Sequence, residues 1–304
     1  MKKIFIFAVM FVLLFAQYSY AFWVWSPKTN KWANPTYHAF DTPEEQFDWA
    51  KGYFDDGDYR KAVSEFRKLA KKFPKNKLAP EAVYYTALSY EKLKKHYKAY
   101  ETYESILATY PLTERFDEIA ERQYLIAEIF FEKKAYERAQ KIFGKTLLNA
   151  PYSKVSDVIQ YKIGLCNLRT KQYSNARDEF EKLTENYTFS PYVDDASFLM
   201  GLCSFKISSG VKDYDEGLID KAVEDLEYFL RRFQTSEYVS QAESLLKKLK
   251  HKKAEHLYEV AHFYEKLNKK FAAEKYYEEI IYSYETTEWA KKAQAKLKLL
   301  ETKH

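Results

Sequence analysis

Only a few residues of this chain have the types and the spacing that chemistry at a site would require. The most suggestive group shares one stripe of a helix, at offsets of 0, 4, 8 and 11: His251, Glu255, Glu259 and His262. Such a stripe could offer ligands to a metal ion, but the ligands of a metal site converge on the ion from several directions. A straight helix spreads these four along its axis, so we expect solvated side chains and no metal site.

Other motifs that carry chemistry are absent from the sequence. Residues 213–217 begin like a calcium-binding loop, but the sixth position of such a loop requires glycine and Leu218 stands there. The sequence contains no phosphate-binding glycine loop, no His-Glu-x-x-His and no Gly-x-Ser-x-Gly, and its 6 histidines are scattered. It therefore predicts no catalytic residue, no cofactor and no enzyme.

The composition is that of a helical globular protein. Of the 304 residues, 46% are apolar and 31% are charged, with 7 Gly, 8 Pro and 2 Cys. These values exclude collagen-like, disulfide-rich and disordered classes and disfavour an all-β fold. The net charge is +5, or +3 once Lys2 and Lys3 are left out of the 49 basic residues that face 44 acidic ones. Because both signs are interleaved, we expect protein or peptide partners and no nucleic acid.

The first 21 residues are typical of a secretory signal peptide. A pair of lysines precedes an apolar run over residues 4–16, and small residues flank Tyr20. We expect cleavage before Phe22 and a periplasmic or secreted chain. The alternative is an uncleaved anchor, since residues 22–25 could lengthen the apolar run toward the ~20 residues that span a bilayer. No cysteine that could carry a lipid follows the signal, so we expect membrane association only indirectly, through partners.

A repeated spacing of small and large residues organises the rest of the chain. In each unit a small residue, the anchor, is followed twelve positions later by alanine and four positions after that by a large apolar residue, with nine extra residues in the fifth unit. The units are Ala50/Ala62/Phe66, Ala87/Ala99/Tyr103, Ala127/Ala139/Phe143, Gly164/Ala176/Phe180, Gly201/Ala222/Leu226 and Ala261/Ala273/Tyr277. Small residues let two helices approach closely, and the large residue fills the gap one turn further on, so each unit is expected to be a helical hairpin.

This spacing resembles the tetratricopeptide repeat over residues 43–302, although the steps between units exceed the ~34 residues of that repeat. We therefore predict an all-α fold, an α-solenoid of about six tetratricopeptide-like helical hairpins plus a C-terminal helix. Cys166 and Cys203 occupy equivalent positions of successive units. Packed helix axes lie about 8–10 Å apart, whereas a disulfide needs Cα atoms within ~6.8 Å, so we expect two buried free thiols.

The C-terminal part resembles the BamD family of outer-membrane β-barrel assembly lipoproteins. The resemblance rests on the insertion at 211–216, on residues 231–238 and on an uninterrupted helical stretch from about Glu237 to Leu267. It implies a non-catalytic periplasmic scaffold in which residues 237–284 and 206–217 dock onto the barrel-forming subunit, while the first three repeats meet unfolded outer-membrane proteins. The chain differs from the family in lacking the lipid-bearing cysteine and in having more than five repeats.

Two rival functions remain for a secreted repeat protein. The CpoB-type proteins of the Tol-Pal system, which coordinate envelope constriction, combine a cleaved signal with similar repeats. A generic secreted assembly scaffold is the other alternative. A coiled coil ahead of the repeats would favour the CpoB type, but residues 22–42 are too short and too aromatic for one.

The first helices of a solenoid line its concave face, so their outward positions decide what binds. Three residues before each anchor lies an aromatic residue, and these form the aromatic row: Phe47, Tyr84, Tyr124, Tyr161, Phe198 and Tyr258. Four residues after each anchor lies the outer row: Phe54, Glu91, Phe131, Leu168, Phe205 and Glu265. The aromatic members of both rows predict a groove for an extended chain, such as an unfolded outer-membrane strand. The alternative is that the aromatic row only packs between neighbouring helices.

Residues 22–42 precede the repeats and form an aromatic segment. They hold three of the 5 tryptophans: Trp23, Trp25 and Trp32. The spacing of these residues around a polar turn predicts a small β-hairpin with tryptophan on one face. Because such a ribbon is marginally stable alone, it either caps the first repeat or serves as a docking arm for a partner.

Overall fold

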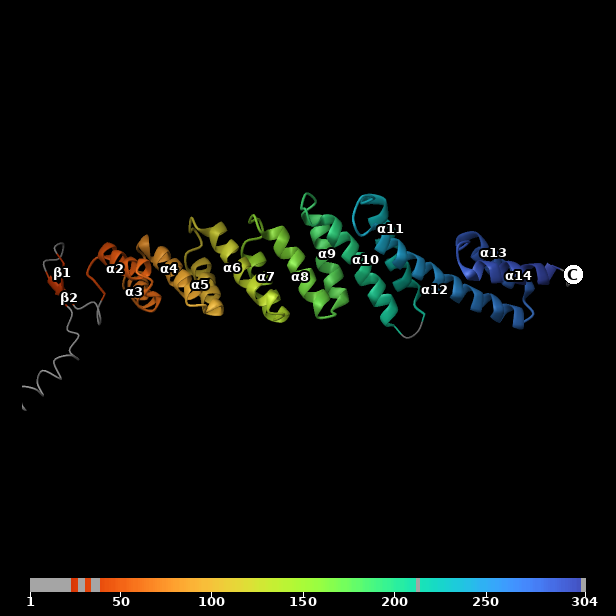
Figure 1. Cartoon of the computed structure of the whole chain (residues 1–304), viewed down its shortest axis with the longest axis horizontal. Helices are drawn as coiled ribbons and strands as arrows, with labels where there is room; N and C mark the ends of the chain where they lie inside the picture. Colours follow the sequence, from red (N-terminus) through yellow and green to blue (C-terminus); the bar gives the residue numbers. More distant parts are fainter. Residues whose placement is uncertain (1–22, 27–30, 34–38, 212–213, 302–304) are drawn as a thin grey trace, which may run out of the picture. The chain divides into compact units, whose positions relative to one another are not determined.

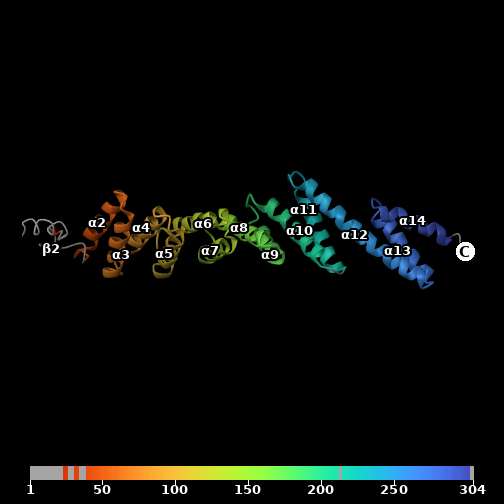
Figure 2. The ribbon, with the colours of Figure 1, turned by 60° about the horizontal axis from the view of Figure 1, so that its bottom comes forward.

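The structure, a computed structural model, describes residues 23–26, 31–33, 39–211 and 214–301. The expected signal peptide at residues 1–21 lies outside the described residues. Contacts divide the chain into two compact units, one up to Ile119 (unit 1) and one from Ala120 onward (unit 2). Figures 1 and 2 label the helices of both units in chain order.

Two short strands precede the helices. They are β1 (Val24–Ser26) and β2 (Lys31–Ala33), and they pair in antiparallel fashion. Trp25 lies directly opposite Trp32, and their ring centroids are 5.4 Å apart. Cross-strand aromatic pairs stabilise a ribbon by about 0.2–1 kcal/mol, so this pair holds the two strands in register.

Unit 1 contains two helical hairpins and the start of a third. The helices are α2 (Pro43–Asp55), α3 (Tyr59–Lys72), α4 (Leu78–Lys92), α5 (His96–Thr109) and the first residues of α6 (Phe116–Glu132). Side-chain oxygens of Thr42 and Asp58 accept hydrogen bonds from backbone N–H groups in the first turns of α2 and α3. These residues therefore act as N-caps and fix where both helices begin.

Unit 2 continues the same pattern to the end of the described chain. Its further helices are α7 (Tyr136–Asn149), α8 (Ser156–Arg169), α9 (Tyr173–Asn186), α10 (Val193–Gly210), α11 (Glu216–Arg232), α12 (Val239–Lys266), α13 (Lys270–Ser283) and α14 (Glu288–Glu301). In the described residues, α2 to α13 pair into six hairpins and α14 follows them. The prediction of an all-α, tetratricopeptide-like repeat fold is confirmed.

The repeated spacing marks the core of every hairpin. The alanine anchors have no exposed surface, nor do the alanines twelve or more positions later: Ala50, Ala87, Ala127 and Ala261, then Ala62, Ala99, Ala139, Ala176, Ala222 and Ala273. The large residues that follow are equally inaccessible to solvent: Phe66, Tyr103, Phe143, Phe180, Leu226 and Tyr277. Close approach of two helices at alanine therefore leaves a gap that one large side chain fills.

Glycine takes the place of alanine as the anchor at Gly164 and Gly201, where the large residue leaves no room for a methyl group. A methyl group on Gly164 would meet Cε1 of the Phe180 ring at 2.5 Å, and one on Gly201 would meet Cδ2 of Leu226 at 2.7 Å. Both separations are shorter than any van der Waals contact between carbon atoms. Only glycine therefore allows these two helix pairs to pack as they do.

We expect Gly164→Ala to lower the free energy of unfolding by about 1 kcal/mol, because overpacking costs about 1–3 kcal/mol and the better helix propensity of alanine offsets part of it. The matched control is Gly144→Ala in α7, where a methyl group would meet nothing within 4 Å. This control should raise the free energy of unfolding by about 0.5–1 kcal/mol. Urea unfolding followed by circular dichroism measures both, and shifts of the same sign would contradict the packing account.

The turn inside five of the hairpins has one shared conformation. The residue seven positions after the anchor has a positive φ: 79° for Gly57, 57° for Lys94, 59° for Lys134, 61° for Lys171 and 58° for Asn268. A left-handed lysine costs roughly 1–2 kcal/mol. The cost is offset by capping hydrogen bonds that run back to the end of the preceding helix, such as the 2.8 Å bond from Lys95 N to the Tyr90 carbonyl.

Cys166 and Cys203 are buried and form no disulfide, as predicted from helix spacing. Burial raises the pKa of both thiols to about 12. Because the thiolate is the reactive form, we expect Ellman's reagent to react with them more than about 100-fold more slowly in the folded chain than in guanidinium chloride. Rapid release of one thiol equivalent from the folded chain would contradict this prediction.

Candidate protein-binding surfaces

The aromatic row lies against the second helix of each hairpin. Each ring contacts a buried ring of that helix, with centroid distances of 5.5 Å for Phe47–Phe66, 5.9 Å for Tyr84–Tyr103, 6.0 Å for Tyr124–Phe143, 5.9 Å for Tyr161–Phe180, 5.6 Å for Phe198–Phe229 and 5.5 Å for Tyr258–Tyr277. Aromatic pairs at this distance contribute about 0.5–1.5 kcal/mol beyond the area that they bury. The row therefore takes part in packing in every repeat.

Several members of the row also contact the following repeat. Tyr161 stacks on Tyr192 at 4.9 Å, and Phe198 stacks on Tyr238 at 4.6 Å. The ring of Tyr84 lies 4.3 Å from the Arg115 guanidinium carbon. The row thus joins successive repeats as well as the two helices of one hairpin.

Burial separates the row into two groups. Tyr84 and Phe198 are only 3% and 4% exposed, so they pack in the core and leave no surface for a ligand. The other four members keep part of their ring accessible: Phe47, Tyr124, Tyr161 and Tyr258. The candidate groove is therefore narrower than the sequence predicts, and it depends on these four.

The outer row is half-buried throughout. In unit 1, Phe54 contacts Tyr59 at 5.4 Å and Tyr85 at 5.2 Å. In unit 2, Phe131 contacts Tyr136 at 5.3 Å, and Phe205 and Leu168 lie at the margins of the hydrophobic clusters of α10–α12 and α8–α10. These side chains present apolar surface beside the aromatic row.

A polar pair accompanies the outer row between α6 and α8. Lys162 lies over the Phe131 ring, 4.8 Å from its centroid, and its Nζ is 2.9 Å from Oε2 of Glu128. Burial and then the Glu128 carboxylate raise the pKa of the neighbouring Tyr124 to about 12. This phenol therefore stays protonated near neutral pH and can donate a hydrogen bond. This surface therefore combines the apolar edges of aromatic rings with hydrogen-bond donors and an acceptor. Its residues are Tyr124, Glu128, Phe131, Tyr161 and Lys162.

The two glutamates of the outer row occur where the buried plug of the second helix is tyrosine. The Tyr103 hydroxyl donates to Glu91 at 2.6 Å, and the Tyr277 hydroxyl donates to Glu265 at 3.0 Å. Lys296 also donates to Glu265, at 2.9 Å. Burial alone would raise the pKa of Glu265, but these hydrogen bonds outweigh it and the pKa is lowered. The glutamates thus satisfy the buried hydroxyl groups of their own hairpins.

The tryptophans of the N-terminal ribbon are exposed, at 55% for Trp23, 40% for Trp25 and 62% for Trp32. The flank of the first repeat is covered by another residue, Phe40, which is 4% exposed and contacts Trp49 at 5.8 Å. The backbone N–H of Phe40 also donates to the buried side chain of Gln46 at 2.9 Å.

We expect deletion of residues 22–38 to shift the melting midpoint by less than about 2 °C, because Phe40 and Gln46 remain and a loss of 1 kcal/mol moves a chain of this size by about 2–4 °C. A scan by differential scanning fluorimetry measures the midpoint. A larger fall would identify the ribbon as a cap on the first repeat rather than a docking arm.

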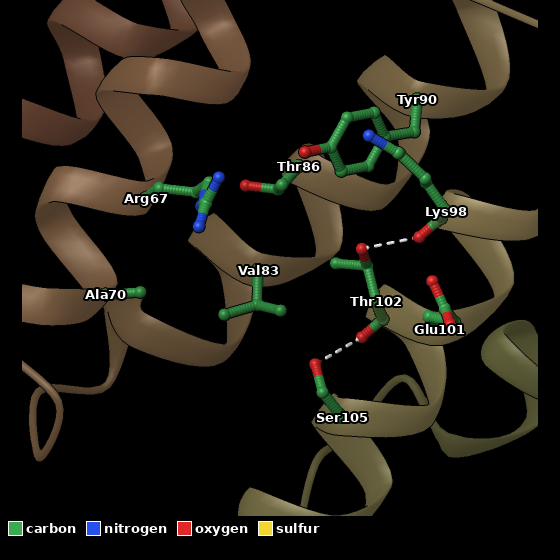
Figure 3. A pocket seen from close by; sticks show the side chains of 9 residues that line it. All are labelled: Arg67, Ala70, Val83, Thr86, Tyr90, Lys98, Glu101, Thr102 and Ser105. Carbon is green, nitrogen blue, oxygen red and sulfur yellow. Dashed lines mark hydrogen bonds between the residues drawn. The ribbon is translucent and has the colours of Figure 1, made fainter. Parts of the chain in front are cut away.

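Unit 1 also contains a surface hollow that the sequence did not indicate. It holds about 400 Å³ between α3, α4 and α5, with Arg67 and Ala70 on one wall and Lys98, Glu101, Thr102 and Ser105 on the other (Figure 3). The hydroxyl groups of Thr102 and Ser105 donate to backbone carbonyls of their own helix at 2.7 and 2.6 Å. The α4 residues Val83, Thr86 and Tyr90 form its floor and belong to neither aromatic nor outer row. Nothing in this arrangement pairs a nucleophile with a base.

The part of the chain that the structure describes contains neither a metal site nor a membrane-spanning helix. No group of three or more His, Cys, Asp or Glu side chains there is arranged to hold a metal ion. Among the helices there, none combines the length and the apolar character needed to cross a bilayer.

Two family profiles match the chain. The profile of a family described as outer membrane lipoprotein (YfiO, the BamD family) matches residues 117–302, and a tetratricopeptide repeat profile matches residues 47–112. The chain belongs to the YfiO family of outer membrane lipoproteins. The resemblance predicted from the C-terminal half is thereby confirmed, and the match to this YfiO-family chain reaches back to the start of α6.

Solved structures similar to this YfiO-family chain are helical-repeat proteins. PilF of Pseudomonas aeruginosa is 16% identical over 84% of this chain and 97% of its own, with a TM-score of 0.35. A tetratricopeptide repeat protein of Parabacteroides merdae is 16% identical over 85% of this chain and 98% of its own, with a TM-score of 0.36. MamA of Desulfovibrio magneticus is 14% identical over 65% of this chain and 98% of its own, with a TM-score of 0.34. No curated protein sequence matches the chain.

One basic segment of this YfiO-family chain corrects the sequence interpretation of evenly interleaved charges. Residues 247–253 read Lys-Lys-Leu-Lys-His-Lys-Lys and lie in the middle of α12. Lys247 is the ninth residue of α12, the position at which the anchors Gly164 and Gly201 stand in α8 and α10. The Lys247 side chain is exposed, so lysine is tolerated there. With 28 residues, α12 is the longest of the described helices, and Figure 2 shows it as one continuous ribbon.

Proposed function

We propose that this protein is a non-catalytic periplasmic scaffold that helps to assemble β-barrel proteins at the outer membrane. The family match over residues 117–302 is the observation that carries the proposal. Repeats of this kind make the chain a protein-interaction scaffold, and its partners would be a barrel-assembly subunit and unfolded outer-membrane proteins. In this proposal the chain acts after removal of its signal peptide and is held at the membrane through those partners.

The surface between α6 and α8 suits the proposed unfolded substrate. Strands of outer-membrane barrels alternate apolar and polar residues and carry aromatic girdles. A strand lying along this surface would direct every second side chain to the same face, against the accessible edges of Tyr124, Phe131 and Tyr161. The Lys162–Glu128 pair beside them offers a donor and an acceptor to the backbone of the strand.

The C-terminal repeat suits the proposed dock for the barrel-forming subunit. Residues 237–284 present four large apolar side chains to solvent: Phe263, Leu267, Phe271 and Tyr282. Apolar side chains that gather around one helical hairpin are typical of protein interfaces. The insertion at 206–217 is the other proposed docking segment, and it is described except for residues 212 and 213.

Site-specific photocrosslinking tests the proposal. A benzophenone side chain at Phe131 lies on the proposed substrate surface, and one at Lys141 is the control because Lys141 is exposed on the second helix of the same repeat. Crosslinks recovered from envelope fractions at Phe131 should contain unfolded outer-membrane proteins or the barrel-assembly subunit, and those at Lys141 should not. Recovery of Tol-Pal components instead would support the CpoB-type function and overturn the proposal.

A further inference from the structure

The turns between repeats carry a row of side chains that the fold does not use. In each turn the residue two positions after the C-cap of the second helix lies at the tip: Lys75, Leu112, Tyr152, Phe189, Thr235 and Thr286. Three successive tips are large and apolar, and they are almost wholly exposed, at 96% for Leu112, 98% for Tyr152 and 100% for Phe189. Burying a side chain of this size would stabilise the fold by about 1.5–3 kcal/mol, and none of that is realised here.

The turns keep their shape without these side chains. In the α9–α10 turn the Ser190 N–H donates to the Tyr187 carbonyl at 2.9 Å, and the Ser190 hydroxyl donates to Asp157 at 2.8 Å. The Tyr187 hydroxyl reaches the Pro151 carbonyl of the preceding turn at 3.4 Å. Because backbone and polar contacts hold the turn in shape, the fold does not require phenylalanine at position 189.

In unit 2 the two aromatic tips belong to one surface. The α7–α8 and α9–α10 turns lie at the same edge, the upper one in Figure 1. Tyr152 and Phe189 line the same open hollow of about 580 Å³ together with Lys154. Unit 1 has the same arrangement by itself, because Leu112 lines a hollow together with Lys75 and Lys77. All three lysines are exposed, so apolar tips and cations occur side by side in both units.

We propose that the inter-repeat turn edge binds the surface of an anionic lipid bilayer, with Tyr152 and Phe189 inserted at the level of the headgroups. Aromatic side chains favour that interface, where an apolar body and a polar rim are both accommodated. Neighbouring lysines gain about 1 kcal/mol each from anionic lipid. The central side chains of a protein–protein interface usually fill well-packed pockets, whereas Tyr152 and Phe189 are almost wholly exposed.

This inference goes beyond the proposed function, which concerns protein chains bound by the first helices and by the C-terminal repeat. It adds a direct membrane contact to the indirect one expected from the sequence. The tips of the last two turns, Thr235 and Thr286, are polar like Lys75 in the first turn, and the proposed protein dock begins at residue 237, directly after Thr235. The membrane edge and the protein dock would then occupy different turns of unit 2.

Vesicle flotation of the chain from Phe22 to His304 tests the proposal. Vesicles of phosphatidylglycerol and phosphatidylethanolamine should bind the wild type, and phosphatidylcholine vesicles should bind it less. The double variant Tyr152→Ser, Phe189→Ser should weaken binding to the anionic vesicles by about tenfold or more. The matched control Leu125→Ser, Leu299→Ser removes two exposed apolar side chains from α6 and α14 and should bind as the wild type does. Equal binding by wild type and tip variant, or equal losses in the two variants, would overturn the proposal.

A second measurement locates the contact even if the tryptophan ribbon contributes to flotation. An environment-sensitive fluorophore on Thr188→Cys reports on the tip, and one on Glu137→Cys reports on the start of α7; both positions are exposed. The native thiols are buried and should not be labelled. Anionic vesicles should shift the emission to the blue only for the Thr188 probe. Unshifted emission there, or capture of a protein by a photocrosslinker at Phe189, would contradict the membrane assignment, whereas the Phe131 crosslinks test the scaffold function separately.

Discussion

Asp225→Ala is expected to lower the free energy of unfolding by about 3 kcal/mol, because it leaves the buried Arg177 guanidinium without its main partner. Asp225 is 3% and Arg177 is 12% exposed, and Nε and Nη2 of Arg177 donate to the two carboxylate oxygens at 2.9 and 3.2 Å. Ser204 donates to the same carboxylate at 2.5 Å. The pair therefore links α9, α10 and α11 across two repeats. Urea unfolding at constant m-value measures the loss.

The expected loss lies at the low end of the range for buried pairs because Glu181 still accepts from Arg177 at 3.1 Å. Burial alone would lower the pKa of Arg177, but the hydrogen bonds to Asp225 and then Glu181 outweigh it and the pKa is raised. The guanidinium therefore stays charged in the variant and cannot escape the cost by losing its proton.

Two further variants test whether the buried, unpaired charge causes this loss of stability. Arg231→Ala breaks an exposed pair with Glu227, 3.8 Å apart, and should change stability by less than about 0.5 kcal/mol. The double change Arg177→Met, Asp225→Leu removes both charges and should recover most of the loss. A loss below about 1 kcal/mol for Asp225→Ala, or no recovery in the double variant, would show that the buried charge is not what destabilises the chain.

The hairpins were predictable because their signal is local. Anchor, second alanine and large residue lie within one pair of helices, and close approach at Ala50 or Ala127 requires the spacing that appears in the sequence. The same logic placed both cysteines on packed first helices and excluded a disulfide. The sequence shows glycine at position 164, but only the structure shows its cause. The Phe180 ring leaves no room there for a methyl group.

The surfaces could not be predicted in the same way because their partners lie in other repeats. Phe198 is buried by Tyr238, which is 40 residues away, and nothing about Phe198 itself distinguishes it from the accessible Tyr161. The Arg177–Asp225 pair spans 48 residues and has no counterpart at the same positions of other repeats. The exposed tips did have a signal, since they recur at a fixed distance from each C-cap, but a search for small anchors does not detect it.

Burial predicts that two aromatic residues of the rows will respond to substitution in opposite ways. Phe198→Ala should lower the free energy of unfolding by about 3–5 kcal/mol, as truncation of a buried phenylalanine does. Its ring stacks on Tyr238 and contacts Phe229, so a cavity would open between two repeats. Phe131→Ala should cost less, about 1–2 kcal/mol, because the ring is already half-exposed.

Binding should show the reverse order. At a temperature where both variants remain folded by circular dichroism, Phe131→Ala should weaken binding of an extended peptide with alternating aromatic residues by about tenfold, the loss of one well-placed contact. Phe198→Ala should bind it as the wild type does, because no ligand can reach a ring enclosed by α11 and α12. If Phe198→Ala abolishes binding while folded and Phe131→Ala does not, the ligand must enter between the repeats and separate Phe198 from Tyr238, and the surface between α6 and α8 is not the groove.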